Sequence, residues 1–508
     1  MNVRALSCPQ TGALATESPL HDLSVIIRSR TPLIVVESNE EPQIVSMVQQ
    51  LGRQLQVRTF RWTVTEGLRA SEPADQPQDS VLKSQEILNY IKTSGSHSVF
   101  MLLDFHPYLQ DSVHVRFLKD IALGYGKHFS TVMLVGATLQ VPAELRPFTA
   151  HFHLPLPKRE ELRAIVYDVA GDWGAEHGAR KVETTNKAID LLVRNLSGLT
   201  ATDARRLALK AINDNGVISE SDMPEVMRAK YELLGRDSPL SFEHETARFA
   251  EIGGMRRLRK WLDLRKSFFL DEEAPPNLDP PRGVLLLGVQ GCGKSLAAKA
   301  AAGIFGAPLL RLDFGVLYSK YYGETESNLR KALDTAEIMA PCVLWLDEIE
   351  KGLAVGDDDD GLSRRVLGTL LTWMSERQRA VFLVATANDI TRLPPEMVRK
   401  GRFDEVFFVD LPSPENRRDI LAIHLRKRSL DPAGFDLEAL ARASEGFSGS
   451  EIEQAIVSAM YTAHAQGRSP AQADLLAEIQ QTRPLSVLLA EKIQETREWA
   501  SERTVPCD

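Results

Sequence analysis

The chain has 508 residues, of which 43% are hydrophobic and 25% are charged, and its formal net charge is −9. This composition is typical of a globular protein and excludes a largely disordered chain, a collagen-like fibre and a coiled-coil rod. At about 150 residues per domain the length predicts three structural units, and the acidic balance makes nucleic acid an unfavoured partner.

No run of about 18 apolar residues occurs, so no membrane insertion is expected, and the N-terminal sequence lacks the apolar core of a signal peptide. The four cysteines, Cys8, Cys292, Cys342 and Cys507, have no metal-binding spacing. A reducing compartment fits this pattern best, which predicts a cytoplasmic protein, or a stromal one if the source has plastids.

The first part of the chain is predicted to be an α/β region. Residues 1–21 are expected to form a flexible tail, and residues 22–157 alternate short apolar runs with helical stretches. Buried strands are expected at 31–38, 57–63, 98–105 and 130–138, with a further apolar segment near 150–156. Strands that alternate with helices indicate βαβ units and a parallel sheet. Residues 158–235 are predicted to be a helical, lid-like region.

A second α/β region follows the polar segment 236–245, which contains Gly and Pro and is predicted to be the linker between domains. The second region is expected over 246–412, followed by a helical lid over 413–470 and a helical tail over 471–508. Its strands are expected at 282–288, 308–314, 341–347, 380–388 and 405–411.

The segment Gly288–Ser295, GVQGCGKS, fits the phosphate-binding pattern G-x-x-x-x-G-K-[ST] between a predicted strand and a predicted helix. Its glycines let backbone N–H groups turn toward phosphate oxygens, and the helix N-terminus adds positive partial charge. Lys294 is expected to reach the β- and γ-phosphates and Ser295 to bind Mg²⁺. The strand and the helix on either side make a chance glycine-rich turn a poor alternative.

Two carboxylates, Asp347 and Glu348, end an apolar strand. On their own they could be two solvated carboxylates. In a chain that also has a phosphate loop earlier in the sequence, they indicate a cation site. Asp347 is expected to hold Mg²⁺ through water, and Glu348 to orient and polarise the attacking water. Asn388 ends the strand VFLVATAN and could align that water, or it could simply start a turn.

Arg399 and Arg402 follow in the segment RKGRF. They are candidates for reaching the γ-phosphate of a neighbouring subunit, where such a charge is worth about 10³–10⁵ in rate. Without the other motifs, a solvated basic loop would be the better interpretation.

These motifs, in this order over about 246–465, resemble those of the AAA ATPases within the AAA+ group. The resemblance implies a P-loop αβα domain of three layers with a parallel sheet and a helical lid. It also implies that Glu348, at the end of the Walker B strand, is the catalytic base and that Asn388 is sensor 1. Arg399 and Arg402 are implied to be arginine fingers acting in trans. The residues implied to bind ATP, the Walker A loop among them, are Ile252, Gly253, Gly288, Val289, Gln290, Gly291, Cys292, Gly293, Lys294, Ser295, Leu296, Ile420, His424 and Gly449.

Tyr321, Tyr322 and Gly323 resemble the pore loop with which hexameric relatives grip a polypeptide, although two packed tyrosines would look the same. The acidic stretch 356–361 is either a second pore loop or a solvated insertion. The loops GVQGCGKS, VATANDI and RKGRF, together with the tail PLSVLLAEKIQETREWA, resemble the Ycf-type AAA proteins, a subfamily named for a conserved chloroplast reading frame. That resemblance covers nearly the whole chain.

The two α/β regions carry similar segments in the same order, which favours a true repeat over the general likeness of α/β units. In this alignment Asp104 matches Asp347, and Phe105 takes the place of Glu348. The first copy has no Gly-Lys-Ser/Thr segment after its first strand, and Glu40 and Glu41 at that position would repel phosphate. We therefore expect a degenerate AAA-like domain that binds no ATP and serves assembly or partner binding.

The sequence thus predicts an ATPase that converts ATP and water to ADP and phosphate with Mg²⁺ as cofactor. Its expected form is a homo-oligomer, a hexamer in related proteins, that remodels an unidentified protein client. One alternative is a low-turnover, nucleotide-dependent switch or scaffold that regulates a partner. Another is a nucleic-acid-directed AAA+ protein, for which the basic clusters 256–260 and 426–428 are the evidence.

Overall fold

The computed structural model describes residues 19–71, 83–213, 216–234, 239–243, 252–270, 278–314, 317, 325–353, 361–377, 379–399 and 401–508. The chain forms two compact units. The first unit comprises the residues up to Pro157 together with Thr200–Asp203, and the second comprises Lys158–Leu199 and Ala204–Asp508. In the described part of the chain, no helix is long and apolar enough to cross a membrane.

The first unit is built on a six-stranded sheet with the order β3-β2-β4-β5-β1-β6. All neighbours pair in parallel except β3, which is antiparallel to β2. The strands are β1 (Leu33–Glu37), β2 (Arg58–Thr63), β3 (Gly67–Ala70), β4 (Ser98–Leu103), β5 (Ser130–Gly136) and β6 (Thr149–Phe152). The predicted parallel α/β region is confirmed, but the short hairpin strand β3 was not predicted.

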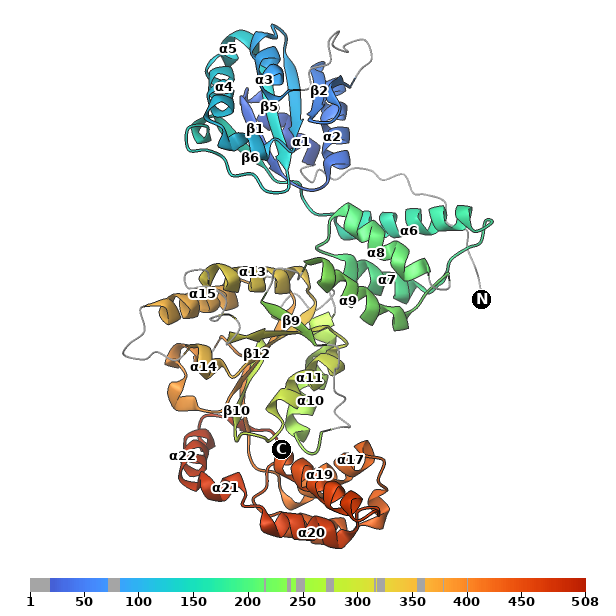
Figure 1. The fold of residues 1–508 in the computed structure, drawn as a ribbon, viewed down its shortest axis with the longest axis vertical. Coiled ribbons are helices and arrows are strands. Elements are labelled where there is room, and N and C mark those ends of the chain that lie inside the picture. Colours follow the sequence, from blue (N-terminus) through green and yellow to red (C-terminus); the bar gives the residue numbers. More distant parts are fainter. Residues whose placement is uncertain are drawn as a thin grey trace. The chain divides into compact units, whose positions relative to one another are not determined.

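Helices cover both faces of this sheet, because successive strand residues point to opposite sides. In β1, Leu33 and Val35 pack with α3 (Ser84–Thr93) and α4 (Ser112–Leu123), whereas Ile34 and Val36 pack with the helices of the other face. Those helices are α1 (Pro19–Arg28) and α2 (Glu41–Leu55), and the short α5 (Tyr125–His128) precedes β5. Figure 1 shows the resulting three layers.

The predicted N-terminal tail ends earlier than expected. Helix α1 begins at Pro19, so residues 19–21 of the predicted tail are helical. Leu23 and Ile27, one turn apart, are buried in the core, and this packing holds the helix in place. Residues 1–18 lie outside the described part of the chain.

The second unit begins with a helical region whose four helices share one hydrophobic core. These helices are α6 (Arg159–Glu176), α7 (Asn186–Leu196), α8 (Ala201–Asn213) and α9 (Met223–Leu234). Two short parallel strands, β7 (Glu183–Thr184) and β8 (Val217–Ile218), join the loops between them. The helical character expected for 158–235 is thus present, with this small sheet added.

A seven-stranded sheet with the order β15-β14-β10-β13-β12-β11-β9 forms the centre of the second unit. Its strands are β9 (Leu240–Glu243), β10 (Gly283–Gly288), β11 (Leu309–Asp313), β12 (Cys342–Asp347), β13 (Val381–Ala387), β14 (Glu405–Val409) and β15 (Val505–Pro506). All pairs are parallel except that of β9 with β11. This confirms the predicted three-layer fold with a parallel sheet.

Two groups of helices sandwich this sheet (Figure 1). Helices α10 (Arg256–Leu270) and α11 (Lys294–Phe305) pack on one face, and α13 (Thr325–Ile338), α14 (Ile349–Leu353) and α15 (Leu362–Glu376) pack on the other. A short helix, α16 (Pro395–Val398), lies between β13 and β14.

The predicted linker over 236–245 is wrong in part, because it contains strand β9. Leu240 is buried there, and the hydroxyl of Tyr231 in α9 donates a hydrogen bond to its carbonyl. The helical region and the sheet are therefore joined by a paired edge strand within one compact unit.

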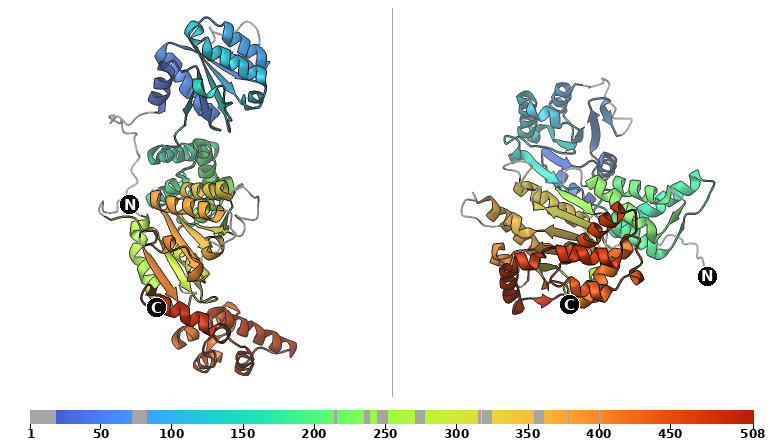
Figure 2. Two further views of the ribbon diagram at one scale, coloured as in Figure 1. Left: turned by 90° about the vertical axis from the view of Figure 1, so that its left-hand side faces the viewer. Right: turned by 60° about the horizontal axis from the view of Figure 1, so that its bottom comes forward.

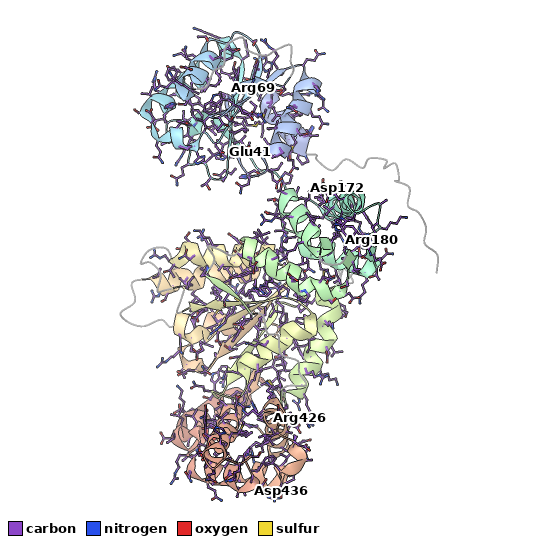
Figure 3. All side chains as sticks on the ribbon, turned by 45° about the vertical axis from the view of Figure 1, so that its right-hand side comes forward. Glu41, Arg69, Asp172, Arg180, Arg426 and Asp436 are labelled. Atoms are coloured by element: carbon purple, nitrogen blue, oxygen red, sulfur yellow. The ribbon has the colours of Figure 1, made fainter. Side chains whose placement is uncertain are left out.

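The lid and the tail follow β14. The lid helices are α17 (Pro414–Lys427), α18 (Leu437–Ala443), α19 (Gly449–Ala465) and α20 (Gln472–Gln481), and the left view of Figure 2 shows them as a group beyond the end of the sheet. Figure 3 marks Arg426 and Asp436 on this group. The predicted lid boundary at 470 is too early, because Leu475 and Ile479 of α20 are buried in the lid core.

The tail consists of α21 (Leu485–Leu488), α22 (Ala490–Ser501) and β15. The prediction of an entirely helical tail is wrong at β15, which pairs with β14 at the edge of the sheet.

The two sheets share one strand order. Reading from the antiparallel edge, β2-β4-β5-β1-β6 of the first unit corresponds to β11-β12-β13-β10-β14 of the second. The antiparallel strand itself differs, since β3 follows β2 in the chain whereas β9 precedes β10. The common order supports the interpretation of the two α/β regions as a repeat.

Candidate functional site

A cavity of about 350 Å³ lies at the carboxyl ends of β10, β12 and β13. Strand β10 lies between β13 and β14. The connection from β10 to β11 runs toward one edge of the sheet, and the connection from the neighbouring β13 to β14 runs toward the other edge. Open α/β sheets bind ligands at such a point. The residues lining the cavity are Ile252, Gly253, Gln290, Gly291, Cys292, Gly293, Lys294, Ser295, Leu296, Asp347, Glu348, Thr386, Asn388, Ile420, Ile423, His424, Gly449, Ser450 and Glu453.

The structure brings most of the predicted site residues together around this cavity. Of the residues predicted to bind nucleotide, Gly288 and Val289 lie in the adjoining backbone and do not line it. Arg399 and Arg402 also lie outside the lining. Tyr321, Tyr322 and Gly323 fall outside the described residues, as does most of the acidic stretch 356–361.

The phosphate-loop segment bends where its glycines allow it. Gly291 and Gly293 have φ angles of +78° and +92°, a region that side chains disfavour. A Cβ atom on Gly291 would lie 2.2 Å from the hydroxyl of Ser450, so the lid helix approaches the loop closely. Helix α11 begins at Lys294, and its unpaired N–H groups point toward the loop.

Lys294 is the buried cation of the site. Its Nζ donates hydrogen bonds to the carbonyls of Gly288 at 2.9 Å and Val289 at 2.8 Å. Burial lowers the pKa of Lys294 to about 8, although nearby carboxylates, including Glu350 and Glu348, act in the opposite direction. An anion bound in the loop would compensate for this loss of solvation.

Thr386 connects the carboxylate of Asp347 to the backbone of Glu348. Its hydroxyl donates to Oδ1 of Asp347 at 2.8 Å and accepts the backbone N–H of Glu348 at 3.1 Å. The other oxygen of Asp347, Oδ2, accepts from Nη2 of Arg311 at 3.0 Å. Glu348 has a φ of +49°, which turns its side chain away from the strand direction.

Asn388 lies beside Glu348, as its predicted role requires. Its side-chain amide donates to Oε1 of Glu348 at 3.1 Å, while Oε2 of Glu348 pairs with Lys351. Its backbone N–H donates to Oε1 of Glu350 at 3.0 Å. Burial raises the pKa of Glu350, whose second carboxylate oxygen is buried without a hydrogen-bond partner. Glu350 thus fixes the backbone of Asn388, and Asn388 fixes the carboxylate of Glu348.

The apolar end of the cavity lies between the segment before α10 and the lid. Gly253 packs so tightly that a Cβ atom there would lie 2.6 Å from Cγ1 of Ile420. His424 is near Glu453, and burial lowers the pKa of its imidazole. A flat, mostly apolar ring such as adenine suits this end, with phosphates at the Lys294 end.

The two predicted finger arginines differ in their surroundings. Arg399 is exposed at the end of α16. Arg402 is half-buried, and its Nη1 contacts the carbonyl of Leu371 and the hydroxyl of Ser375 on α15. Arg399 is therefore the freer of the two to reach another molecule.

The residues at the phosphate end fit a magnesium–nucleotide complex. In the described residues, no group of three or more His, Cys, Asp or Glu side chains could hold a metal ion unaided. A hydroxyl, Ser295, and a carboxylate, Asp347, line the same cavity. Mg²⁺ keeps several waters and takes its other ligands from one or two protein oxygens and phosphates, so this donor set is sufficient when nucleotide is present.

The same edge of the first unit is built differently. Only Ser38–Glu40 separate β1 from α2, and Glu40 is buried. Its carboxylate accepts hydrogen bonds from the N–H of Thr202 at 3.0 Å and from the Thr202 hydroxyl at 2.8 Å, and residue 202 belongs to this unit. A carboxylate thus lies at the start of α2, where the second unit has its phosphate loop.

The match of Asp104 with Asp347 is wrong by one residue. Strand β4 ends at Leu103 and β12 ends at Asp347, and the next residue in each case is left-handed, with φ values of +51° for Asp104 and +49° for Glu348. Asp104 therefore corresponds to Glu348. The sequence pattern misled because Asp104, like Asp347, is the first carboxylate after an apolar run.

Sequence comparison agrees with this geometry. The profile of the ATPase family associated with various cellular activities (AAA) matches residues 284–411, and that of the AAA+ lid domain matches 434–477. Profiles for the N-terminal and second domains of SpoVK-like AAA ATPases match residues 20–154 and 160–237. The chain belongs to the AAA ATPase family.

Relatives extend over nearly the whole chain. Two "Uncharacterized AAA domain-containing protein ycf46" sequences, from Guillardia theta and Trieres chinensis, are 32% and 33% identical over 94% of this AAA protein, and the matches cover 94% and 96% of the relatives. The proteasome-activating nucleotidase of Aeropyrum pernix is 31% identical over 60% of this chain and 74% of its own length.

Sequence reasoning did not single out several residues of this AAA site. Thr386, Ile423 and Glu453 line the cavity, Glu350 contacts Asn388, and Arg311 contacts Asp347. A signal was present for Thr386, a polar residue inside the apolar strand VFLVATAN. For Glu350 and Arg311 the contacts depend on pairing between strands and turns that sequence spacing does not reveal.

Proposed function

We propose that this chain binds Mg-ATP in the cavity at the ends of β10, β12 and β13 and hydrolyses it. The observation that carries the proposal is the hydrogen bond of 3.1 Å from Asn388 to Glu348 beside the phosphate loop. That contact fixes a carboxylate beside the loop, which supports its assignment as the general base. Membership of a family of ATPases is consistent with this activity.

In this proposal each side chain has a separate task. Lys294 and the N-terminus of α11 bind the β- and γ-phosphates. Mg²⁺, held by Ser295, by Asp347 through water and by the phosphates, would neutralise charge that develops on them. Glu348 accepts the proton of the attacking water, and Asn388 keeps the Glu348 carboxylate in position.

We further propose that the active unit is an oligomer that remodels a protein client. Arg399 is exposed and could complete a neighbour's site, which is the task of an arginine finger. The relationship to a proteasome-activating nucleotidase supports a protein client over nucleic acid. A reducing compartment suits the described cysteines, Cys292, Cys342 and Cys507, all of which are free thiols.

ATP turnover per subunit, measured across a range of protein concentrations, tests the proposal. A steep rise with concentration is expected, because Arg399 acts only after assembly. Glu348→Gln should bind ATP without hydrolysing it, and Lys294→Ala should not bind it. Full turnover by Glu348→Gln would refute the assigned base.

Arg399→Ala should lose about 10³-fold in rate while keeping its nucleotide affinity. Added Glu348→Gln subunits, which retain Arg399, should restore part of this activity. Arg483→Ala, at another exposed arginine, is the matched control and should behave as the unaltered chain. A slow rate that does not depend on concentration, with ATP tightly bound, would favour the alternative of a nucleotide-dependent switch.

A further inference from the structure

Arg311 is a cation at the back of the proposed metal site. It lies on β11, next to β12, where Arg311 pairs with Trp345 and Asp313 pairs with Asp347. Its Nη2 is 3.0 Å from Oδ2 of Asp347 and 3.7 Å from a carboxylate oxygen of Asp313. It does not line the nucleotide cavity, so Asp347 stands between the cavity and this guanidinium.

The arginine is held in place by more than this ion pair. Its Cζ lies 4.9 Å from the ring centroid of Trp345, a cation–π distance. The Arg311 side chain is about one-third exposed and that of Asp347 is 17% exposed, so water screens the pair only in part. The guanidinium of Arg311 is therefore held in one position by Asp347 and Trp345.

Both oxygens of Asp347 are thus occupied by hydrogen-bond donors before any ligand arrives. Oδ1 accepts from Thr386 and Oδ2 accepts from Arg311. A carboxylate that already neutralises a guanidinium attracts a hydrated dication less strongly than a free carboxylate does. The same positive charge makes the end of the cavity more favourable for phosphates that carry no metal ion.

We propose that Arg311 is a positioning residue for Asp347 that reduces the dependence of nucleotide binding on Mg²⁺. The proposal rests on the proposed nucleotide site. It assigns Arg311 two effects of opposite sign: it strengthens nucleotide binding without Mg²⁺ and weakens the gain in affinity that Mg²⁺ provides.

The test measures the dissociation constant of a fluorescent ADP derivative with the full chain, once in excess Mg²⁺ and once in EDTA. The quantity of interest is the ratio of the EDTA value to the Mg²⁺ value. Arg311→Gln should raise this ratio about fivefold, the upper range for a partly exposed ion pair. Arg311→Lys, which keeps the charge, should leave it near that of the unaltered chain.

Two controls make the result specific. Arg330→Gln removes an arginine whose partner is Glu326 on α13 and should leave the ratio unchanged. In an Asp347→Asn background, Arg311→Gln should raise the ratio much less, because the carboxylate that Arg311 neutralises is absent and only its direct attraction for metal-free phosphates is lost. Asp347→Asn alone should bind ADP more tightly in EDTA, which also tests the proposal if the Arg311 variants fold poorly.

An unchanged or lower ratio in Arg311→Gln would overturn the inference, as would an equal rise in the Asp347→Asn background. Absence of ADP binding by the unaltered chain in both conditions would instead refute the nucleotide site itself. The two failures are therefore distinguishable.

Discussion

At the scale of single residues, the edge of the cavity that holds the proposed catalytic base is a chain of hydrogen bonds across three segments. Thr386 on β13 links the carboxylate of Asp347 to the backbone of Glu348, and Asn388 links the side chain of Glu348 to Glu350. Each link restricts the conformations that the carboxylates of Asp347 and Glu348 can adopt. Positions held in this way are typical of preorganised active sites.

Thr386→Val should lower kcat with little change in nucleotide affinity. Valine has nearly the same shape, but it removes the acceptor for the Glu348 N–H and the donor to Asp347. Loss of such bonds costs about 1–3 kcal/mol, which is about a fivefold to 160-fold loss of rate if it is felt in the transition state. Steady-state kinetics measure both parameters, and Thr386→Ser, which keeps the hydroxyl, is the control. Equal rates for the two variants would contradict this assignment.

At the scale of elements, the two units show how one strand order can carry different chemistry. In the second unit a glycine loop joins β10 to α11 and leaves N–H groups and Lys294 facing a cavity. In the first unit a shorter connection places Glu40 at the start of α2, bonded to Thr202. The negative charge of Glu40 at the N-terminus of α2 would repel a phosphate at that position.

Glu40→Ala should therefore destabilise the first unit, by about 2 kcal/mol, because it removes the buried carboxylate that accepts two hydrogen bonds from Thr202. Urea denaturation, followed by the fluorescence of Trp62 in that unit's core, measures the loss. Millimolar inorganic phosphate should restore part of the stability of Glu40→Ala and leave the unaltered chain unaffected. Glu41→Ala, at the neighbouring, less buried carboxylate, should show neither effect. Equal stability of both variants would contradict the role of Glu40.

At the scale of the whole molecule, the helical region and the AAA sheet of the second unit are joined through a buried lysine. Nζ of Lys230 in α9 donates to the carbonyl of Ser197 at 2.6 Å and to that of Ile338 at 2.7 Å. These carbonyls lie at the C-terminal ends of α7 and α13, where a positive charge is favoured. Burial nevertheless lowers the pKa of Lys230 to about 7, against a smaller opposite effect of Cys342.

This lysine predicts a pH dependence with a definite sign. The unfolded chain binds the proton of Lys230 up to about pH 10.5, but the folded chain releases it near pH 7, so this group makes stability rise with pH between those values. The slope is at most about 1.4 kcal/mol per pH unit. Denaturation of the second unit at several pH values should show a flatter profile for Lys230→Met than for the unaltered chain. Lys331→Met, at an exposed lysine of the same unit, is the control, and parallel profiles for all three would refute the prediction.

Much of the fold and of the site could be predicted because their signals are local. Apolar runs of strand length mark the parallel strands, and the phosphate loop, the acid pair and Asn388 occupy strand ends that meet at one edge of a sheet. Strands in short, exposed or weakly apolar segments are harder to predict from the sequence, and β3, β9 and β15 were missed for that reason. The lid boundary failed because α20 is defined by packing against other helices.

The sequence by itself determined the family, the order of the motifs and the residues of the phosphate loop, since these depend on chemistry within a few consecutive positions. Only the tertiary structure decided that Asp104 corresponds to Glu348, that Glu40 meets Thr202, and that Arg311 and Thr386 hold Asp347. The contacts of Glu40, Arg311 and Thr386 join positions far apart in the chain. The match of Asp104 with Glu348 depends on the residue at which each strand ends. Backbone pairing and burial set such contacts, and no local pattern records them.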